Sequence, residues 1–120
     1  MSEIEAKMPT EVRPWGAFFV IEEGTDYKVK RITVKPKGQL SLQSHSHRAE
    51  HWTVVQGEAT ATVGGTVRRL VRGDSIDIPR GAIHRLENFG SAELQVIEVQ
   101  FGQYLGEDDI TRYNDIYGRR

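Results

Sequence analysis

The sequence has 120 residues and a formal net charge of −1, from 16 Lys and Arg against 17 Asp and Glu. This balance argues against nucleic-acid binding by phosphate neutralisation, which needs a basic excess on one face. The lack of cysteine excludes disulfides, thiolate metal ligands and cysteine nucleophiles. No apolar run approaches the length of a membrane span, and the N-terminus lacks the apolar core of a secretory signal. We therefore expect a cytoplasmic protein that binds neither membrane nor nucleic acid.

The first part of the chain predicts an arm followed by a hairpin. Residues 1–12 show no sustained period of 2 or 3.6, so we expect an extended N-terminal arm and a single domain over 13–120. Residues 17–22 and 27–34 are rich in β-branched and aromatic side chains. The turn-forming residues 23–26 between them indicate a β-hairpin.

The rest of the chain predicts a series of short strands. They are expected at 40–44, 51–56, 59–63, 67–70, 75–78, 84–88 and 93–99. Glycine-bearing turns separate them at spacings typical of an all-β sandwich or barrel. After Phe101 the acidic and aromatic residues of 106–117 predict a short helical turn or a tail that closes over the mouth of a site.

The histidines are the strongest local signal, because three of the four lie between positions 45 and 51. In a strand, side chains at i and i+2 share a face, so His45 and His47 can present two imidazoles to one point. Glu50 and His51 follow after two residues, a gap that suits a turn between antiparallel strands. On a regular strand only one of Glu50 and His51 faces inward. The fourth, His84, follows the tight turn at 79–81.

The spacing of these residues resembles the two signature motifs of the cupin superfamily. The first comprises Gly38, His45, His47, Glu50 and Gly57, and the second Gly73, Pro79, Gly81, His84 and Asn88. The resemblance implies an all-β double-stranded β-helix, or jelly-roll barrel, with a metal bound by His45, His47, Glu50 and His84. Cupins usually have three or four residues between the second histidine and the glutamate. Here there are two, so His51 stands as an alternative to Glu50.

Several strings narrow this resemblance to one family. HRAEHW at 47–52, HRLEN at 84–88 and YLGEDDI at 104–110 resemble the type II phosphomannose isomerase domain. This domain is the C-terminal cupin of bifunctional mannose-1-phosphate guanylyltransferase/mannose-6-phosphate isomerases. Ser46 departs from the family, which typically has histidine there, and we expect no guanylyltransferase domain in so short a chain. The string LSLQSH at 40–45 also resembles the Gln-x-His element of type I phosphomannose isomerases, which implies Gln43 in place of His47 as a ligand.

The resemblance implies interconversion of mannose 6-phosphate and fructose 6-phosphate through a cis-enediol, with a divalent metal. Zinc suits nitrogen and carboxylate ligands best, and Mn²⁺, Fe²⁺, Co²⁺ and Ni²⁺ are also admissible. Candidate phosphate ligands are Lys30, Arg48, Arg80, Arg85, Arg112 and Arg119. As acid/base we expect Glu98, with Glu87 or an unliganded His51 as alternatives. Lys30, Arg48, Arg85 and Glu98 form the predicted catalytic set.

Two other functions fit a cupin of this kind, because one fold hosts many activities. One is a non-catalytic sugar-binding cupin. The other is a non-haem metal oxygenase, since two histidines and a carboxylate with open positions also suit iron. For any of these functions we expect a homodimer, because the exposed edges of a small barrel commonly pair.

Overall fold

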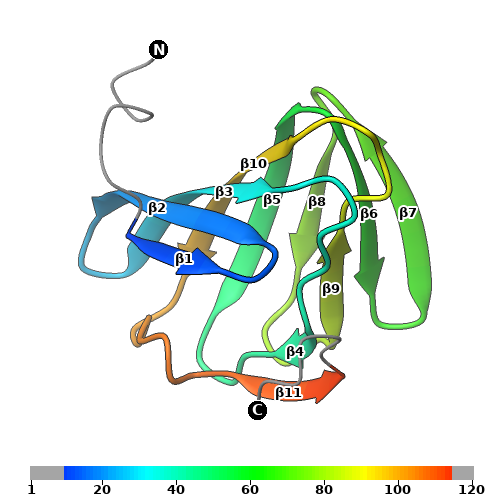
Figure 1. Cartoon of the computed structure of the whole chain (residues 1–120). Helices are drawn as coiled ribbons and strands as arrows, with labels where there is room; N and C mark the ends of the chain where they lie inside the picture. The colour runs from blue at the N-terminus through cyan, green and yellow to red at the C-terminus, as the bar shows by residue number, and fades with distance from the viewer. Residues whose placement is uncertain (1–9, 115–120) are drawn as a thin grey trace.

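The computed structural model describes residues 10–114, which form eleven strands in two antiparallel sheets (Figure 1). The strands of the larger sheet are β1 (Glu11–Arg13), β2 (Gly16–Glu23), β3 (Tyr27–Val34), β5 (Ala49–Gln56), β8 (Ser75–Ile78) and β10 (Leu94–Phe101). Those of the smaller sheet are β4 (Leu42–Ser44), β6 (Glu58–Val63), β7 (Thr66–Val71), β9 (His84–Glu87) and β11 (Thr111–Asn114). No helix occurs over 10–114, and hence none that could span a membrane in this part of the chain.

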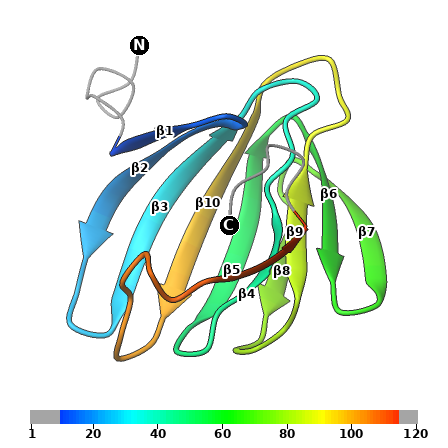
Figure 2. The ribbon, with the colours of Figure 1, turned by 60° about the horizontal axis from the view of Figure 1, so that its bottom comes forward.

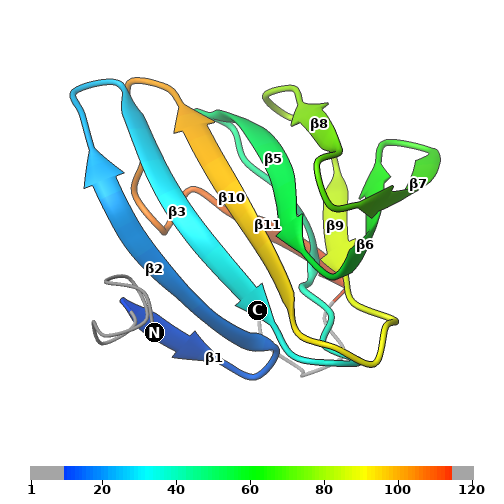
Figure 3. The same cartoon turned by 90° about the horizontal axis from the view of Figure 1, so that it is seen from above.

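The two sheets face each other across the core (Figure 3). The six-stranded sheet has the order β1-β2-β3-β10-β5-β8 and the five-stranded sheet the order β11-β4-β9-β6-β7. The chain passes from one sheet to the other between β3 and β4, β4 and β5, β5 and β6, β7 and β8, β8 and β9, β9 and β10, and β10 and β11. This winding is the expected double-stranded β-helix, the jelly roll of cupins.

The inward faces of the strands change from apolar to polar along the barrel. On β10, Leu94 and Val96 are fully buried, and the next inward residue, Glu98, is buried as well. On β5, which pairs with β10, Val54 lies opposite Val96. Farther toward the other end of this pair, Glu50 is also buried. One end of the barrel is therefore an ordinary hydrophobic core, and the other holds buried charges.

Asn88 shows why the second motif ends with a short polar side chain. Its amide nitrogen donates to the carbonyls of Val34, Lys35 and Ala92, and its side chain is completely buried. One residue thus satisfies three carbonyls, one at the end of β3 and two in loops, that would otherwise lose water. This residue holds together the loops at the apolar end of the barrel.

The structure corrects the expectation for both ends of the described chain. Residues 11–13, placed mostly in the arm, form β1 and pair with β2, and residues 111–114 form β11 on β4 instead of a helical turn. Strands this short show too few alternations for a period of 2 to be recognised. Residues 1–9 of the predicted arm and residues 115–120, with Tyr117 and Arg119, lie outside the described residues.

We predict that Gly16→Ala lowers the free energy of unfolding by about 2 kcal/mol or more. Gly16 has φ +152, and a Cβ at this position would lie 2.0 Å from the carbonyl oxygen of Thr33 on β3. The β2–β3 pairing must shift to admit it. Urea denaturation measures the loss. Gly65→Ala, in open space at the β6–β7 turn, is the control and should cost no more than about 0.5 kcal/mol. Equal losses for both variants would contradict the prediction.

Candidate metal centre and its pocket

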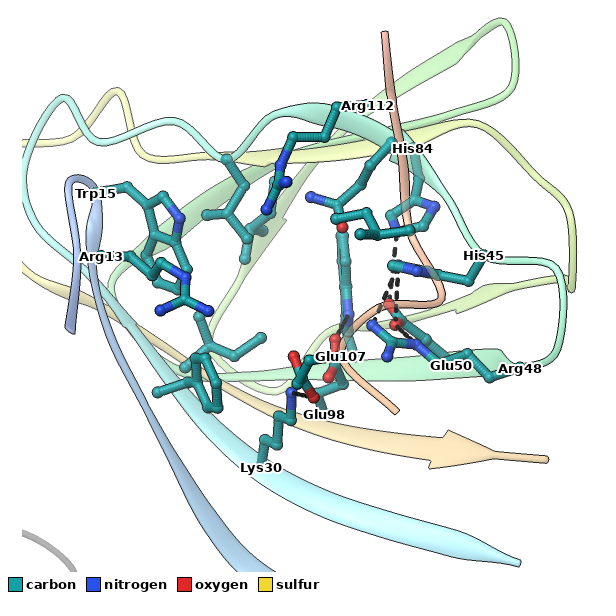
Figure 4. A pocket seen from close by; sticks show the side chains of 17 residues that line it. Arg13, Trp15, Lys30, His45, Arg48, Glu50, His84, Glu98, Glu107 and Arg112 are labelled. Carbon is teal, nitrogen blue, oxygen red and sulfur yellow. Dashed lines mark hydrogen bonds and ion pairs between the residues drawn. The ribbon is translucent and has the colours of Figure 1, made fainter. Parts of the chain in front are cut away.

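The polar end of the barrel forms a pocket between the two sheets (Figure 4). It contains a cluster of two imidazoles and a carboxylate, several cations, two further carboxylates and an apolar wall. The lining residues are Arg13, Trp15, Phe18, Lys30, Ile32, Leu40, Gln43, His45, Arg48, Glu50, Trp52, His84, Leu86, Glu98, Glu107, Ile110 and Arg112. Charged groups are thus concentrated in a partly enclosed space, where electrostatic interactions are stronger than in water.

His45, Glu50 and His84 form the cluster, and each is buried. Glu50 points inward from β5, and His84 is the first residue of β9. His45 immediately follows β4, whose Gln43 pairs with His84, so the β4–β9 contact brings the two imidazoles together. The Nε2 atoms of His45 and His84 lie 3.4 and 3.5 Å from the two oxygens of Glu50. One potential ligand atom from each residue lies within 4.8 Å of the others.

Backbone carbonyls orient both imidazoles. Nδ1 of His45 donates to the carbonyl of Asp109 at 2.6 Å, and Nδ1 of His84 donates to the carbonyl of Ala82 at 2.9 Å. Because a carbonyl oxygen only accepts, the proton of each neutral ring is on Nδ1. The lone pair of each Nε2 is therefore directed toward Glu50, as in metal sites whose histidines are held by an outer hydrogen bond.

Burial and neighbouring charges set the protonation of the cluster. Burial, followed by the positive charge of Arg48, lowers the pKa of His45 to about 4, and burial also lowers the pKa of His84. Burial and the nearby Glu98 carboxylate raise the pKa of Glu50. Burial acts to raise the pKa of Glu98 too, but Lys30 and Arg48 outweigh it and lower that pKa. Near pH 7 both imidazoles are neutral, the form that binds metals.

The donor set fits a divalent metal ion. Imidazole nitrogen and carboxylate oxygen are ligand atoms that divalent metals such as zinc take in proteins. The two imidazole nitrogens approach different oxygens of Glu50, at 3.4 and 3.5 Å, and one ligand atom from each residue lies within 4.8 Å of the others. Arg48 donates from Nε to Glu50 at 2.7 Å, and its Nη2 lies 3.2 Å from Nε2 of His45. Arg48 and a metal ion therefore compete for the same two ligand atoms.

The structure does not bring His47 to the cluster. Gln43, His45 and His47 do not share a strand face as expected, because β4 ends at Ser44 and the chain turns at 46–47. His47 is exposed and packs edge-on against Tyr104. Gln43 does line the pocket, although its amide nitrogen donates to the carbonyl and hydroxyl of Ser41. Of the two alternatives for the fourth ligand, His47 and Gln43, only Gln43 lines the pocket that contains the cluster.

Strand alternation separates Glu50 from its neighbour His51. Glu50 faces the pocket, whereas His51 faces outward and pairs with Asp77 on β8 at 2.6 Å. Arg85 likewise alternates with His84 and lies outside the pocket, where its Nε is 3.3 Å from Glu87. The expectation that Arg85 reaches the site is therefore corrected. Glu87, an alternative acid/base, is also absent from the pocket lining.

The other residues predicted to bind phosphate also fall into two groups, those that line the pocket and those that do not. Lys30, Arg48 and Arg112 line the pocket. Arg80 is exposed and borders a separate surface groove beside His47, and Arg119 lies outside the described residues.

Glu98 is one member of a buried row that crosses three neighbouring strands. It lies opposite Lys30 of β3 and Trp52 of β5, and all three are nearly inaccessible. Its two oxygens accept hydrogen bonds from Trp52 Nε1 at 2.9 Å and from Gln100 Nε2 at 2.6 Å. The row places a fixed carboxylate beside the cluster.

Two further charged residues line the pocket: Arg13, which was not predicted, and Glu107, which lies in the tail predicted to close over the mouth. Arg13 extends into it from β1, and Glu107 reaches over it to Lys30, with 2.6 Å between Nζ and Oε2 (Figure 4). Arg13 is at the edge of the segment predicted to be an arm, so no periodicity marked its direction. Glu107 belongs to an acidic run that is ordinarily a solvated turn, but the position of this run after the last predicted strand indicated a tail over the mouth. No local signal distinguishes Arg13 from a surface charge.

Comparison with known proteins decides the family. A family model described as "Mannose-6-phosphate isomerase C-terminal" matches residues 2–115. The chain belongs to this family. Its members include proteins much longer than this chain, which spans less than a quarter of the length of the three relatives described next.

These relatives are bacterial biosynthetic proteins. The chain is 57% identical over 107 residues to the xanthan biosynthesis protein XanB of Xanthomonas campestris, covering 89% of the chain and 23% of XanB. It is 54% identical over 116 residues to the mannose-1-phosphate guanylyltransferase ManC of Salmonella typhimurium, covering 96% and 24%. It is 52% identical over 107 residues to the alginate biosynthesis protein AlgA of Pseudomonas putida, covering 89% and 22%.

Comparison with solved structures supports the double-stranded β-helix fold of this chain. A double-stranded β-helix protein from Klebsiella pneumoniae aligns with a TM-score of 0.73 and 21% identity, over 96% of this chain and 97% of that one. KdgF from Halomonas sp. aligns with a TM-score of 0.75 and 18% identity, over 83% and 92%. At these identities the likeness concerns the fold alone.

Proposed function

We propose that the chain is a metal-dependent isomerase that interconverts mannose 6-phosphate and fructose 6-phosphate. The observation that carries the proposal is one pocket that joins a His45–Glu50–His84 cluster to a separate buried carboxylate, Glu98, and to several cations. Aldose–ketose isomerisation needs these three functions: charge stabilisation at two oxygens, proton transfer between two carbons, and phosphate binding. Family membership supports this reading.

His45, Glu50 and His84 would hold the metal, with Gln43 at the adjacent wall. A bound divalent ion supplies Lewis-acid stabilisation of negative charge on sugar oxygens. Zinc suits this donor set best, and Mn²⁺, Fe²⁺, Co²⁺ or Ni²⁺ are alternatives. The guanidinium of Arg48 contacts both His45 and Glu50. With the metal bound to these two residues, Arg48 would donate hydrogen bonds to hydroxyl or carbonyl oxygens of the substrate.

Glu98 would act as the acid/base. Its carboxylate takes the proton from C2 of mannose 6-phosphate and returns it to C1, while a proton moves from O2 to O1. The hydrogen bonds from Trp52 and Gln100 hold the carboxylate in place during both transfers. Lys30 opposite Glu98 keeps positive charge beside the site where the enediolate forms.

Phosphate binding falls to the cations on the far side of the pocket from the cluster. Arg13 and Arg112 approach this space from β1 and β11, and Trp15 lies beside Arg13 (Figure 4). Guanidinium groups match phosphate geometry and bind it through paired hydrogen bonds. A substrate bound there by its phosphate extends its C1–C2 end toward Glu98 and the cluster.

A coupled assay tests the function on purified protein. We expect conversion of mannose 6-phosphate to stop after chelation and to return with Zn²⁺, Mn²⁺, Co²⁺, Fe²⁺ or Ni²⁺. Arg13→Gln is expected to raise KM about tenfold or more with little change in kcat, because a charged hydrogen bond is lost. Absence of turnover with every metal, in folded and metal-loaded protein, would refute the isomerase.

The same cluster allows a second candidate, because two histidines and one carboxylate also form the facial triad of non-haem iron oxygenases. Oxygen consumption by the Fe²⁺-loaded protein, together with no isomerase turnover, would favour it. Binding of sugar phosphate without either reaction would instead favour a sugar-binding cupin.

A further inference from the structure

A C-terminal strap, residues 102–110, joins the two sheets at the open end of the barrel. It leaves β10 of the six-stranded sheet and crosses the mouth to β11, which pairs with β4 of the other sheet (Figure 2). Glu107 and Ile110 of the strap line the pocket. The strap therefore forms part of the pocket wall. It leads directly into β11, which pairs with β4, the strand that His45 follows.

Asp109 of the strap makes three hydrogen bonds to three consecutive residues after β4. Its main-chain carbonyl accepts from His45 Nδ1 at 2.6 Å. Its two carboxylate oxygens accept from the backbone N–H groups of Ser46 and His47, each at 2.9 Å. One residue thus contacts both the imidazole of a candidate ligand and the turn that carries it.

The strap is held on its other side by β3. Lys28 Nζ donates to the carbonyl of Leu105 at 3.0 Å, and Lys30 Nζ donates to Glu107 at 2.6 Å. Asp109 N–H closes a local turn by donating to the carbonyl of Gly106 at 3.2 Å. These hydrogen bonds hold the strap against β3, and Asp109 connects the strap to residues 45–47.

We propose that Asp109 is a positioning residue for the metal centre: its carboxylate anchors the 45–47 turn so that its own carbonyl holds the His45 ring with Nε2 toward Glu50. This rests on the metal site of the proposed function. β4 ends at Ser44, so His45 has no partner within a strand. Its carbonyl accepts from the N–H of Gly81, and Asp109 of the strap supplies the hydrogen bond that orients its ring.

The chemistry of the Asp109 side chain supports this role. Each of its two carboxylate oxygens accepts one backbone N–H, from Ser46 and from His47, at 2.9 Å. An amide in its place has only one accepting oxygen and directs an N–H₂ group toward the second donor. Outer-shell partners of this kind typically change metal affinity 10- to 100-fold.

The test measures metal binding directly. Zn²⁺ affinity is determined by competition with a chromophoric chelator, and the ligand geometry by the visible absorption of the Co²⁺-loaded protein. We expect Asp109→Ala to weaken Zn²⁺ binding about 10- to 100-fold and to change the Co²⁺ spectrum. Asp109→Asn should lie between Asp109→Ala and the unaltered protein, because one of the two N–H bonds is kept.

Two controls separate positioning from general loosening of the strap. Asp108→Asn removes the same charge one residue away, where the carboxylate bonds only the exposed Tyr104 among its described partners. Tyr113→Phe removes the 2.9 Å bond between β11 and Ser44 without touching the 45–47 turn. Both should keep the affinity within about twofold and the Co²⁺ spectrum unchanged. Thermal unfolding of the metal-free proteins identifies any variant that fails to fold.

The outcomes distinguish this proposal from the function. Unchanged Zn²⁺ affinity and Co²⁺ spectrum in folded Asp109→Ala would overturn the role of Asp109 while leaving the isomerase untouched. The expected affinity loss in a protein without isomerase turnover would support Asp109 and refute the isomerase. An equal affinity loss in Asp108→Asn would also overturn the proposal, since a nonspecific charge effect would then explain both variants.

Discussion

His84→Ala is expected to abolish tight Zn²⁺ binding and to lower kcat/KM for mannose 6-phosphate by about 10³-fold or more. The variant removes one of the two imidazole nitrogens that face Glu50. Metal stabilisation of transition-state charge is worth several kcal/mol, and each 1.4 kcal/mol is about tenfold in rate. Chelator competition and the coupled assay, on the same preparation, measure the two losses.

His51→Ala is the matched control for this prediction. It removes an imidazole adjacent in sequence to Glu50, but one that faces outward and pairs with Asp77. We expect Zn²⁺ affinity and turnover to stay within about twofold of the unaltered protein, and the same for exposed His47→Ala. A loss of bound metal in His51→Ala but not in His84→Ala would overturn the ligand set placed around Glu50.

Glu98→Gln is expected to lower kcat by about 10²- to 10⁴-fold while the protein retains its metal, because general acid/base catalysis is typically of this size. The amide keeps the shape of the side chain but cannot accept the C2 proton. The fold can accommodate it, since the buried Oε1 of Gln100 has no hydrogen-bond partner and can accept from the new amide. Stopped-time assays at saturating substrate measure kcat, and metal analysis measures occupancy.

Glu87→Gln is the control for Glu98. Glu87 is also a buried carboxylate near the end of a strand, but it pairs with Arg85 and lies outside the pocket. Turnover should remain within about threefold of the unaltered protein. If Glu98→Gln retains full kcat with metal bound, another group moves the proton and the assignment of Glu98 fails.

Much of the fold could be predicted because its signals are local. The β-branched and aromatic side chains of 27–34, and the short run 75–78 between turns, predicted β3 and β8 with the same bounds as in the structure. The glycines and Pro79 marked turns whose geometry depends on their own backbone, as Gly73 and Gly81 show with φ of +92 and +83. These features depend on residues close in sequence, so a single chain is enough to reveal them.

The candidate site was predicted in part for the same reason. His45, Glu50 and His84 were all named from the resemblance to cupin motifs, and the structure gathers them in one buried cluster. The assignment of Glu50 or His51 required knowing which face of β5 turns inward. That face is decided by pairing with β10 and β8, and hence by contacts far apart in sequence.

The jelly-roll class, the family resemblance and the residue types able to bind a metal could all be read from the residues in order. The folded chain was needed to show that His47 turns away, that Arg13 enters the pocket and that Arg85 does not. Strand alternation is set by neighbouring residues, whereas the end of a strand depends on what satisfies the next backbone N–H groups. Here a carboxylate more than sixty positions away, Asp109, satisfies them and turns the chain after Ser44.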